Sequence, residues 1–189
     1  MSAAGPPQGA KHGAAGHSSL FGPSNPAQAG LEPRASAPPG GSEVHAVPSV
    51  GALVVLDTNI VLDAFVFSDA AALPLRAGLE SGSLQWIATA DMRAELARVL
   101  GYPQIVPRLA FYQLSADDVL AAFDRHAQAV EAAPKAPVTC SDPDDQKFID
   151  LAVAHHCPLL SKDRAVLDMR KRLLALGVRA GVDIGLVSM

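Results

Sequence analysis

Carboxylate side chains occur at four separate points of the chain, each beside an apolar segment. Asp57 and Asp163 closely follow short apolar runs, Glu95 lies in an amphipathic stretch, and three aspartates lie within 142–145. Carboxylates gathered at one place repel one another, so they raise one another's pKa or require a cation. The natural cations for a site made of oxygen ligands are Mg²⁺ and Mn²⁺. Such chemistry requires a fold that brings the four points together.

Apolar periodicity predicts the elements that position these acids. Short apolar runs predict strands at 52–56, 84–89, 136–140 and 157–161, with further strand residues near the C-terminus. Helical spacing predicts helices at 60–67, 70–80, 90–101, 115–133, 141–156 and 163–177. Strands that alternate with helices indicate an α/β domain with a mainly parallel central sheet.

Two of these helices carry start signals. Ser115 and Asp118 have the spacing of a capping box. Asp142 is predicted to cap the helix that contains Pro143 in its first position. These signals indicate where the two helices begin.

The predicted sheet places the acids at one edge. Ligands of open parallel sheets bind outside the carboxyl ends of the strands. Asp57 and Asp163 follow two strands and therefore lie at that edge, and the aspartates at 142–145 join them if the strand at 136–140 is parallel. Glu95 lies one turn inside the helix that follows the strand at 84–89.

Each acid also has a purely structural interpretation. Asp57 and Asp163 could cap helices, a role that contributes about 1 kcal/mol. The acids before the helix at 141–156 suit its N-terminal dipole. Glu95 could pair with Arg93 or Arg98 on its own helix. Their joint placement at one edge favours a metal site over four separate structural roles.

Three stretches resemble the ordered acidic motifs of the PIN-domain nucleases, in particular the branch of toxin components in bacterial toxin–antitoxin systems. They are VVLDTNIVLDAF, AELARVL and SDPDDQKFIDLAVAHHCPLLSKD, and the resemblance covers about residues 53–176. It implies a three-layer α/β/α domain. It also implies an endoribonuclease that uses one or two Mg²⁺ or Mn²⁺ ions to hydrolyse single-stranded RNA, with a cognate antitoxin as partner.

The resemblance carries over to particular residues. The four family acids fall on Asp57, Glu95, Asp145 and Asp163, with Asp142 and Asp144 as alternatives to Asp145, which the spacing to SKD favours. Thr58, Asn59 and Ser161 are implied to orient these ligands or a phosphate. The ending VDIGLVSM lacks the Thr-Pro of that branch, and the first 49 residues have no counterpart in it.

Two other function classes stay open. A haloacid-dehalogenase-like phosphatase also begins with a strand that ends in Asp, but it needs a second acid where this chain has Asn59. A non-catalytic PIN-like scaffold that binds RNA or protein would normally have lost acids, whereas all four are present here. Metal-dependent cleavage of RNA distinguishes the nuclease from both.

The charge balance limits how RNA can be bound. A formal net charge of −4 disfavours a polyanion, although bound metal would reverse the sign at the acids. Arg164, Arg179 and the run 170–172 form a basic cluster that could follow an RNA backbone or could be a solvated helix face. Few phosphate contacts are therefore expected.

Composition predicts a soluble cytoplasmic protein without a membrane segment. No uncharged apolar run approaches the roughly 20 residues that span a bilayer, and the N-terminus lacks a secretory pattern. Cys140 and Cys157 make no C-x-x-C pair and are expected to be buried thiols. Phe65, Phe67 and Leu73 form an apolar helix face that could serve the core or a homo-oligomer.

The first 49 residues are rich in Ala, Gly, Pro and Ser and have no periodic apolar pattern. Such a segment buries too little surface to offset the entropy of ordering, so 1–49 is predicted to be a disordered tail before a PIN domain at 50–189. A chain that begins at Pro48 is therefore expected to keep its fold and its metal-dependent activity. An insoluble or inactive truncated chain would show that the tail is structural.

Overall fold

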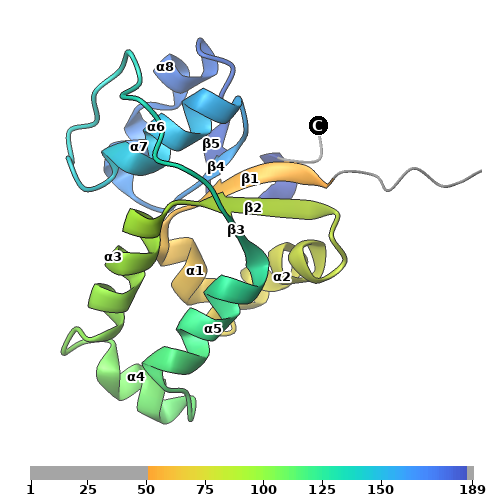
Figure 1. Cartoon of the computed structure of the whole chain (residues 1–189), viewed down its shortest axis with the longest axis vertical. Coiled ribbons are helices and arrows are strands. Elements are labelled where there is room, and N and C mark those ends of the chain that lie inside the picture. The colour runs from red at the N-terminus through yellow and green to blue at the C-terminus, as the bar shows by residue number, and fades with distance from the viewer. Residues whose placement is uncertain (1–50, 187–189) are drawn as a thin grey trace, which may run out of the picture. The chain divides into compact units, whose positions relative to one another are not determined.

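A five-stranded, all-parallel sheet forms the centre of the structure, a computed structural model that describes residues 51–186 (Figure 1). The strand order is β3-β2-β1-β4-β5. The strands are β1 (Ala52–Leu56), β2 (Leu84–Ala88), β3 (Ala127–Ala129), β4 (Leu159–Leu160) and β5 (Ala180–Gly181). The end of β1 is fully buried at Val54, Val55 and Leu56, as expected of a central strand covered on both faces.

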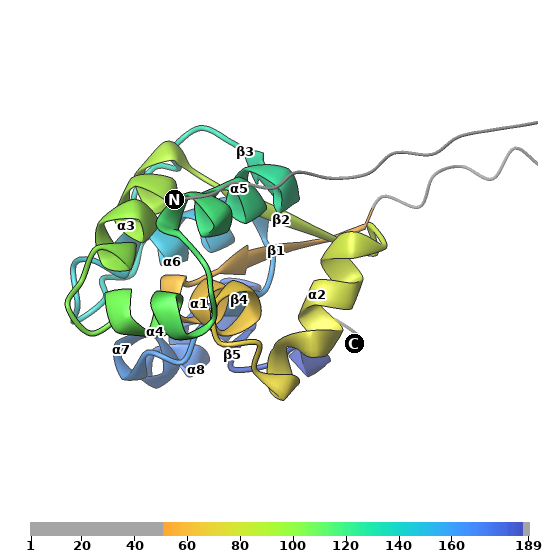
Figure 2. The same cartoon turned by 90° about the horizontal axis from the view of Figure 1, so that it is seen from below.

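Helices cover both faces of this sheet. One layer contains α1 (Thr58–Phe65), α2 (Leu73–Glu80), α3 (Ala90–Leu100), α4 (Val106–Phe111) and α5 (Ala116–His126), and the other contains α6 (Gln146–His155), α7 (Arg164–Asp168) and α8 (Arg170–Leu174) (Figure 1). Figure 2 views the first layer from its own side and shows it spread from α3 to α2. The predicted α/β/α architecture is confirmed.

The order of the strands creates a switch point beside β1. The chain first moves outward from β1 to β2 and β3, and then returns past β1 to form β4 and β5. Because parallel crossovers are right-handed, this reversal moves the connecting helices to the other face. The carboxyl ends of β1 and β4 flank the resulting crevice, which is where open α/β sheets bind ligands.

The third strand is not where the sequence predicted it. The helix predicted at 115–133 ends at His126, and Ala127–Ala129 instead pairs with Trp86–Ala88 of β2. The prediction of a strand at 136–140 is wrong. The tertiary requirement that β2 pair its backbone groups overrides the helical pattern of the local sequence.

Side chains of α6 satisfy the backbone of the segment at 136–140. Gln146 accepts from the Cys140 amide at 2.8 Å and donates to the Val138 carbonyl at 3.1 Å. Asp150 accepts from the Ala136 amide at 2.8 Å and from the Gln146 side chain at 2.7 Å. These bonds replace the strand ladder that this segment lacks.

The start of α6 also differs from the prediction. The helix begins at Gln146, with Asp145 in the N-cap position, so the prediction that Asp142 caps a helix from Pro143 is wrong. The Asp142 carboxylate instead accepts from the Asp144 amide at 2.9 Å, which favours a turn. The later start places Asp145 at the edge of the sheet.

Other elements agree in part. The capping box of Ser115 and Asp118 is confirmed. The helix predicted at 163–177 is two short helices separated at Met169. Helix α4 was not predicted, although Pro107 in its first turn is a helix signal.

Within residues 51–186 no helix is both long and apolar enough to cross a bilayer. The predicted tail at 1–49 lies outside the described residues.

Replacing Gln146 by Ala should lower the free energy of unfolding by about 1–3 kcal/mol, because backbone groups of the 136–140 segment lose their partners. Chemical denaturation of the two proteins measures this loss. Gln128→Ala, which truncates an exposed side chain on β3, is the matched control and should change stability by less than about 0.5 kcal/mol. Equal effects of the two substitutions would contradict the role given to Gln146.

Candidate active site

Asp57 ends β1 and is almost fully buried, with 2% of its surface exposed. It stands in the N-cap position of α1, but its side chain makes no capping hydrogen bond. Its Oδ2 instead accepts from the Ser161 hydroxyl at 2.6 Å. Burial raises the pKa of Asp57 more than this hydrogen bond lowers it, and the charges of Asp163 and Glu95 raise it further. Capping therefore does not explain why Asp57 is there.

Ser161 and Asp163 follow β4, the neighbour of β1. Ser161 is fully buried, and its hydroxyl oxygen also accepts from the Asp163 amide at 2.9 Å. One oxygen of Asp163 accepts from the Ala165 amide at 2.7 Å and so caps α7. The capping interpretation holds for Asp163, but it uses only one of the two carboxylate oxygens.

Glu95 reaches the same edge from α3. Its Oε1 accepts from the Thr58 hydroxyl at 2.9 Å, and its Oε2 forms an ion pair with the Lys147 ammonium. Among the described residues Glu95 forms no ion pair with Arg93 or Arg98, the structural alternative. Arg93 instead binds Asp124 through two hydrogen bonds of 2.6 and 2.7 Å. Thr58 and Lys147 therefore hold both oxygens of a nearly buried carboxylate.

Asp145 is the acid whose ionisation is most perturbed. It is 8% exposed, and burial raises its pKa to about 7, with additional contributions from the charges of Asp57, Asp163 and Asp142 and from a hydrogen bond shared with the Asp163 side chain. Within the described residues its Oδ2 has no hydrogen-bond partner. A buried carboxylate oxygen without a partner is costly unless a proton or a cation compensates it.

Three of these acids, Asp57, Glu95 and Asp145, line an open hollow of about 410 Å³. Its lining includes Asp57, Thr58, Asn59, Glu95, Arg98, Asp144 and Asp145. Asn59, Asp142 and Asp144 are exposed, whereas Asp163 is not part of this lining and acts on the acids through its charge. The structure thus brings the predicted acids to one edge from β1, α3, the start of α6 and the end of β4.

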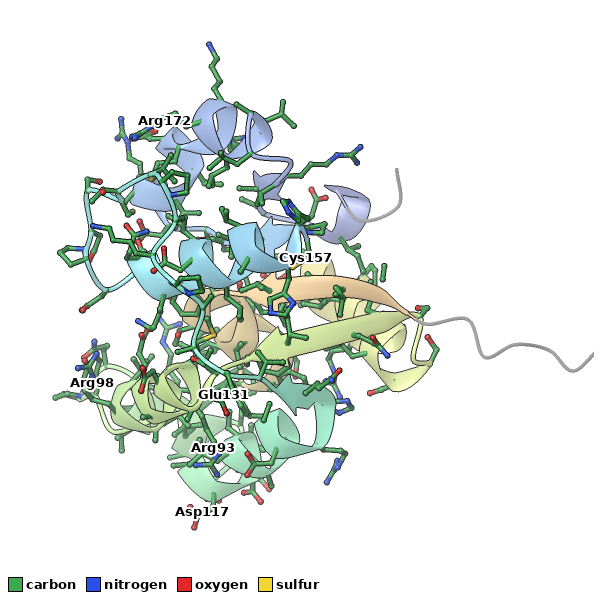
Figure 3. The ribbon with its side chains drawn as sticks, turned by 45° about the horizontal axis from the view of Figure 1, so that its top comes forward. Arg93, Arg98, Asp117, Glu131, Cys157 and Arg172 are labelled. Atoms are coloured by element: carbon green, nitrogen blue, oxygen red, sulfur yellow. The ribbon has the colours of Figure 1, made fainter. Side chains whose placement is uncertain are left out.

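Two basic residues of the site were not predicted to belong to it, although Arg98 was considered as an ion-pair partner of Glu95. Lys147 lies two residues after Asp145, in the first turn of α6, and its partner Glu95 is on the opposite layer. Arg98 lies one turn after Glu95 and projects from the end of α3 (Figure 3). The i, i+3 spacing of Glu95 and Arg98 was a usable signal, whereas Lys147 required the tertiary structure.

The acids suit a divalent cation by their chemistry. In the part of the chain that the structure describes, no three His, Cys, Asp or Glu side chains stand in a ready arrangement for a metal ion. Glu95 is held by Lys147, and Asp163 caps α7 with one oxygen. Asp145 nevertheless keeps a buried oxygen without a partner beside the charge of Asp57, which is the property that an oxygen-binding cation such as Mg²⁺ would satisfy.

Comparison with known proteins identifies the fold family. A family model for the PIN domain matches residues 53–165, which is more than half of the chain and includes all four candidate acids. The chain therefore belongs to the PIN domain family, whose members are generally nucleases. A comparison with curated proteins gives no match.

Comparison with solved structures gives a weak similarity. The structure is similar to VapBC2 from Rickettsia felis, which was crystallised bound to a DNA fragment from its promoter. The two chains are 13% identical, the match covers 68% of this chain and 98% of the other, and the TM-score is 0.46. This likeness is too distant to add to the family assignment.

Without metal, stability should fall as pH rises from about 4 to 7. Between these values the unfolded chain releases the Asp145 proton while the folded protein, with the pKa near 7, retains it. By linkage, the free energy of unfolding falls by at most about 4 kcal/mol over this pH range. Urea denaturation in EDTA at a series of pH values should give a shallower slope for Asp145→Asn than for wild type. Asp117→Asn, at an exposed position of α5, is the control. Identical slopes in all three proteins would contradict the prediction.

Proposed function

We propose that this protein is a Mg²⁺- or Mn²⁺-dependent endoribonuclease that hydrolyses phosphodiester bonds of single-stranded RNA. The observation that carries the proposal is the buried oxygen of Asp145, which has no hydrogen-bond partner among the described residues and lies beside the buried carboxylate of Asp57. Membership of the PIN domain family supports the nuclease class. The choice of RNA is supported by the DTN and SKD motifs, which resemble the toxin branch of the family.

Asp57, Asp145 and Asp163 would hold the divalent ion. When bound, such an ion makes a water molecule a better nucleophile and offsets the negative charge of a phosphate. Ser161 positions Asp57 by donating to its Oδ2, and Thr58 positions Glu95 in the same way. Asn59 and Arg98 line the open hollow, where their donors could contact a phosphate. Asp142 adds negative charge near Asp145.

The RNA would be held at only a few phosphates. Arg164 lies near Asp168 at 3.8 Å, and the run 170–172 lies on α8. Figure 3 shows Arg172 on α8 and Arg98 on α3, which belong to opposite helical layers. Because these charges are spread over two layers and the net charge is −4, affinity should depend on the metal site more than on a basic groove.

The DTN and SKD motifs also support an antitoxin as partner, and the acidic hollow suits an antitoxin that inserts a basic side chain.

The apolar face of Phe65, Phe67 and Leu73 bears on self-association. Phe65 stacks on Trp86 at 6.3 Å and Phe67 contacts Tyr112 at 6.4 Å, so both contribute to intramolecular packing. Leu73, with 55% of its surface exposed, is the member of that face that could contact a second copy in a homo-oligomer.

A cytoplasmic location is part of the proposal because Cys140 and Cys157 are free and buried.

Cleavage of end-labelled substrates tests the proposal. The purified chain should cut single-stranded RNA with Mg²⁺ or Mn²⁺ and should not cut it in EDTA. Asp57→Asn should lower the rate at least about 100-fold, because a metal-binding charge is lost, whereas Asp117→Asn should leave it unchanged. Hydrolysis of a phosphomonoester alone would favour the phosphatase, and an absence of cleavage with either ion would favour the scaffold.

A further inference from the structure

The contact between Lys147 and Glu95 joins the two helical layers across the carboxyl edge of the sheet. Glu95 lies on α3 in one layer, and Lys147 lies on α6 in the other. Their side chains are 14% and 26% exposed, so this is a largely buried ion pair. Breaking such a pair leaves an uncompensated charge, which is costly.

The Lys147 ammonium is held on three sides. Besides Glu95 Oε2, it donates to the backbone carbonyl of Asp144. It also lies 4.8 Å from the centre of the Phe148 ring, which is buried. A carboxylate, a carbonyl and an aromatic face are the partners that an ordered ammonium uses. The ammonium is therefore fixed in the site rather than free in solvent.

Glu95 depends on this ammonium for charge compensation. Its Oε1 is occupied by the Thr58 hydroxyl at 2.9 Å. Among residues 51–186 the partner of its Oε2 is the Lys147 ammonium, so the ion pair with Lys147 is what offsets its charge. Asp145 differs, because within that range its Oδ2 has no hydrogen-bond partner and the side chain that Asp145 contacts is another carboxylate, Asp163.

The position of the pair divides the site into two parts. A second hollow of about 390 Å³ is lined by Lys147 and shares Glu95, Arg98 and Asp144 with the hollow that contains Asp57 and Asp145. Asp57 and Asp145 line only the first hollow. A divalent ion on the aspartates would therefore lie on one side of Glu95, and the tethered ammonium lies on the other.

We propose that Lys147 serves as the second cation of this site, so that the protein binds one divalent ion, on Asp57, Asp145 and Asp163, and Glu95 is not a metal ligand. This inference rests on the proposed function. The four acids of the site, when ionised, carry a formal charge of −4. Lys147 changes this charge to −3, and one divalent ion changes it to −1. A second divalent ion would have to compete with Lys147 for Glu95 Oε2.

Counting bound Mn²⁺ in the full chain tests the inference without an activity assay. Titration calorimetry and electron paramagnetic resonance should find one Mn²⁺ per wild-type chain, with no spin-coupled pair. Lys147→Met removes the charge but keeps most of the apolar stem, so a second Mn²⁺ should bind and couple to the first. Lys147→Arg keeps the charge and should stay at one ion. Two ions in wild type, or one ion in Lys147→Met, would overturn the inference.

A second pair of variants keeps the test valid if Lys147→Met does not fold. Glu95→Gln should change the Mn²⁺ dissociation constant by less than about threefold, whereas Asp57→Asn should weaken binding at least about 100-fold. A loss in Glu95→Gln that equals the loss in Asp57→Asn would make Glu95 a ligand and overturn the inference. A wild-type chain that binds no Mn²⁺ at all would instead contradict the metal-dependent function itself.

Discussion

The hydrogen bond from Ser161 to Asp57 joins residues that are 104 positions apart in the sequence, just after the paired strands β4 and β1. It is short, at 2.6 Å, and both residues are buried. A buried carboxylate requires such a donor, because an ionised group without partners costs several kcal/mol. The strand order makes the bond possible, since β4 returns to pair with β1 at the switch point.

The other acids are positioned relative to this bond by separate elements, and each has a different balance of partners. Asp163 caps α7, Glu95 is held by Thr58 and Lys147, and Asp145 keeps an oxygen without a partner. The carboxylate with the fewest partners is also the one whose pKa rises to about 7. Unequal compensation makes Asp145 the acid most dependent on a proton or a cation.

Much of this site could be predicted from local sequence. Asp57 and Asp163 follow short buried strands, and the carboxyl ends of all strands in a parallel sheet lie at the same edge. Asp145 lies at that edge as expected, although the prediction of a strand at 136–140 before it is wrong. The chain arrives there through a segment held by Gln146 and Asp150.

The remaining features depend on tertiary structure. Ala127–Ala129 becomes β3 because β2 needs a partner, and nothing in its Ala-Gln-Ala sequence favours a strand. The partner of Glu95 is Lys147 rather than a residue of its own helix, because the two helical layers meet at this edge. Local periodicity contains no information on either contact.

The central claim is that Asp57 is buried at this edge to bind a divalent cation. Thermal unfolding with and without Mn²⁺ tests it most directly, because a ligand that binds only the folded state stabilises it by mass action, by about 2.7 kcal/mol at 100 times its dissociation constant. The account predicts that Mn²⁺ raises the melting temperature of the wild-type protein and raises that of Asp57→Asn much less. An equal rise in both proteins, or no rise in either, would contradict it.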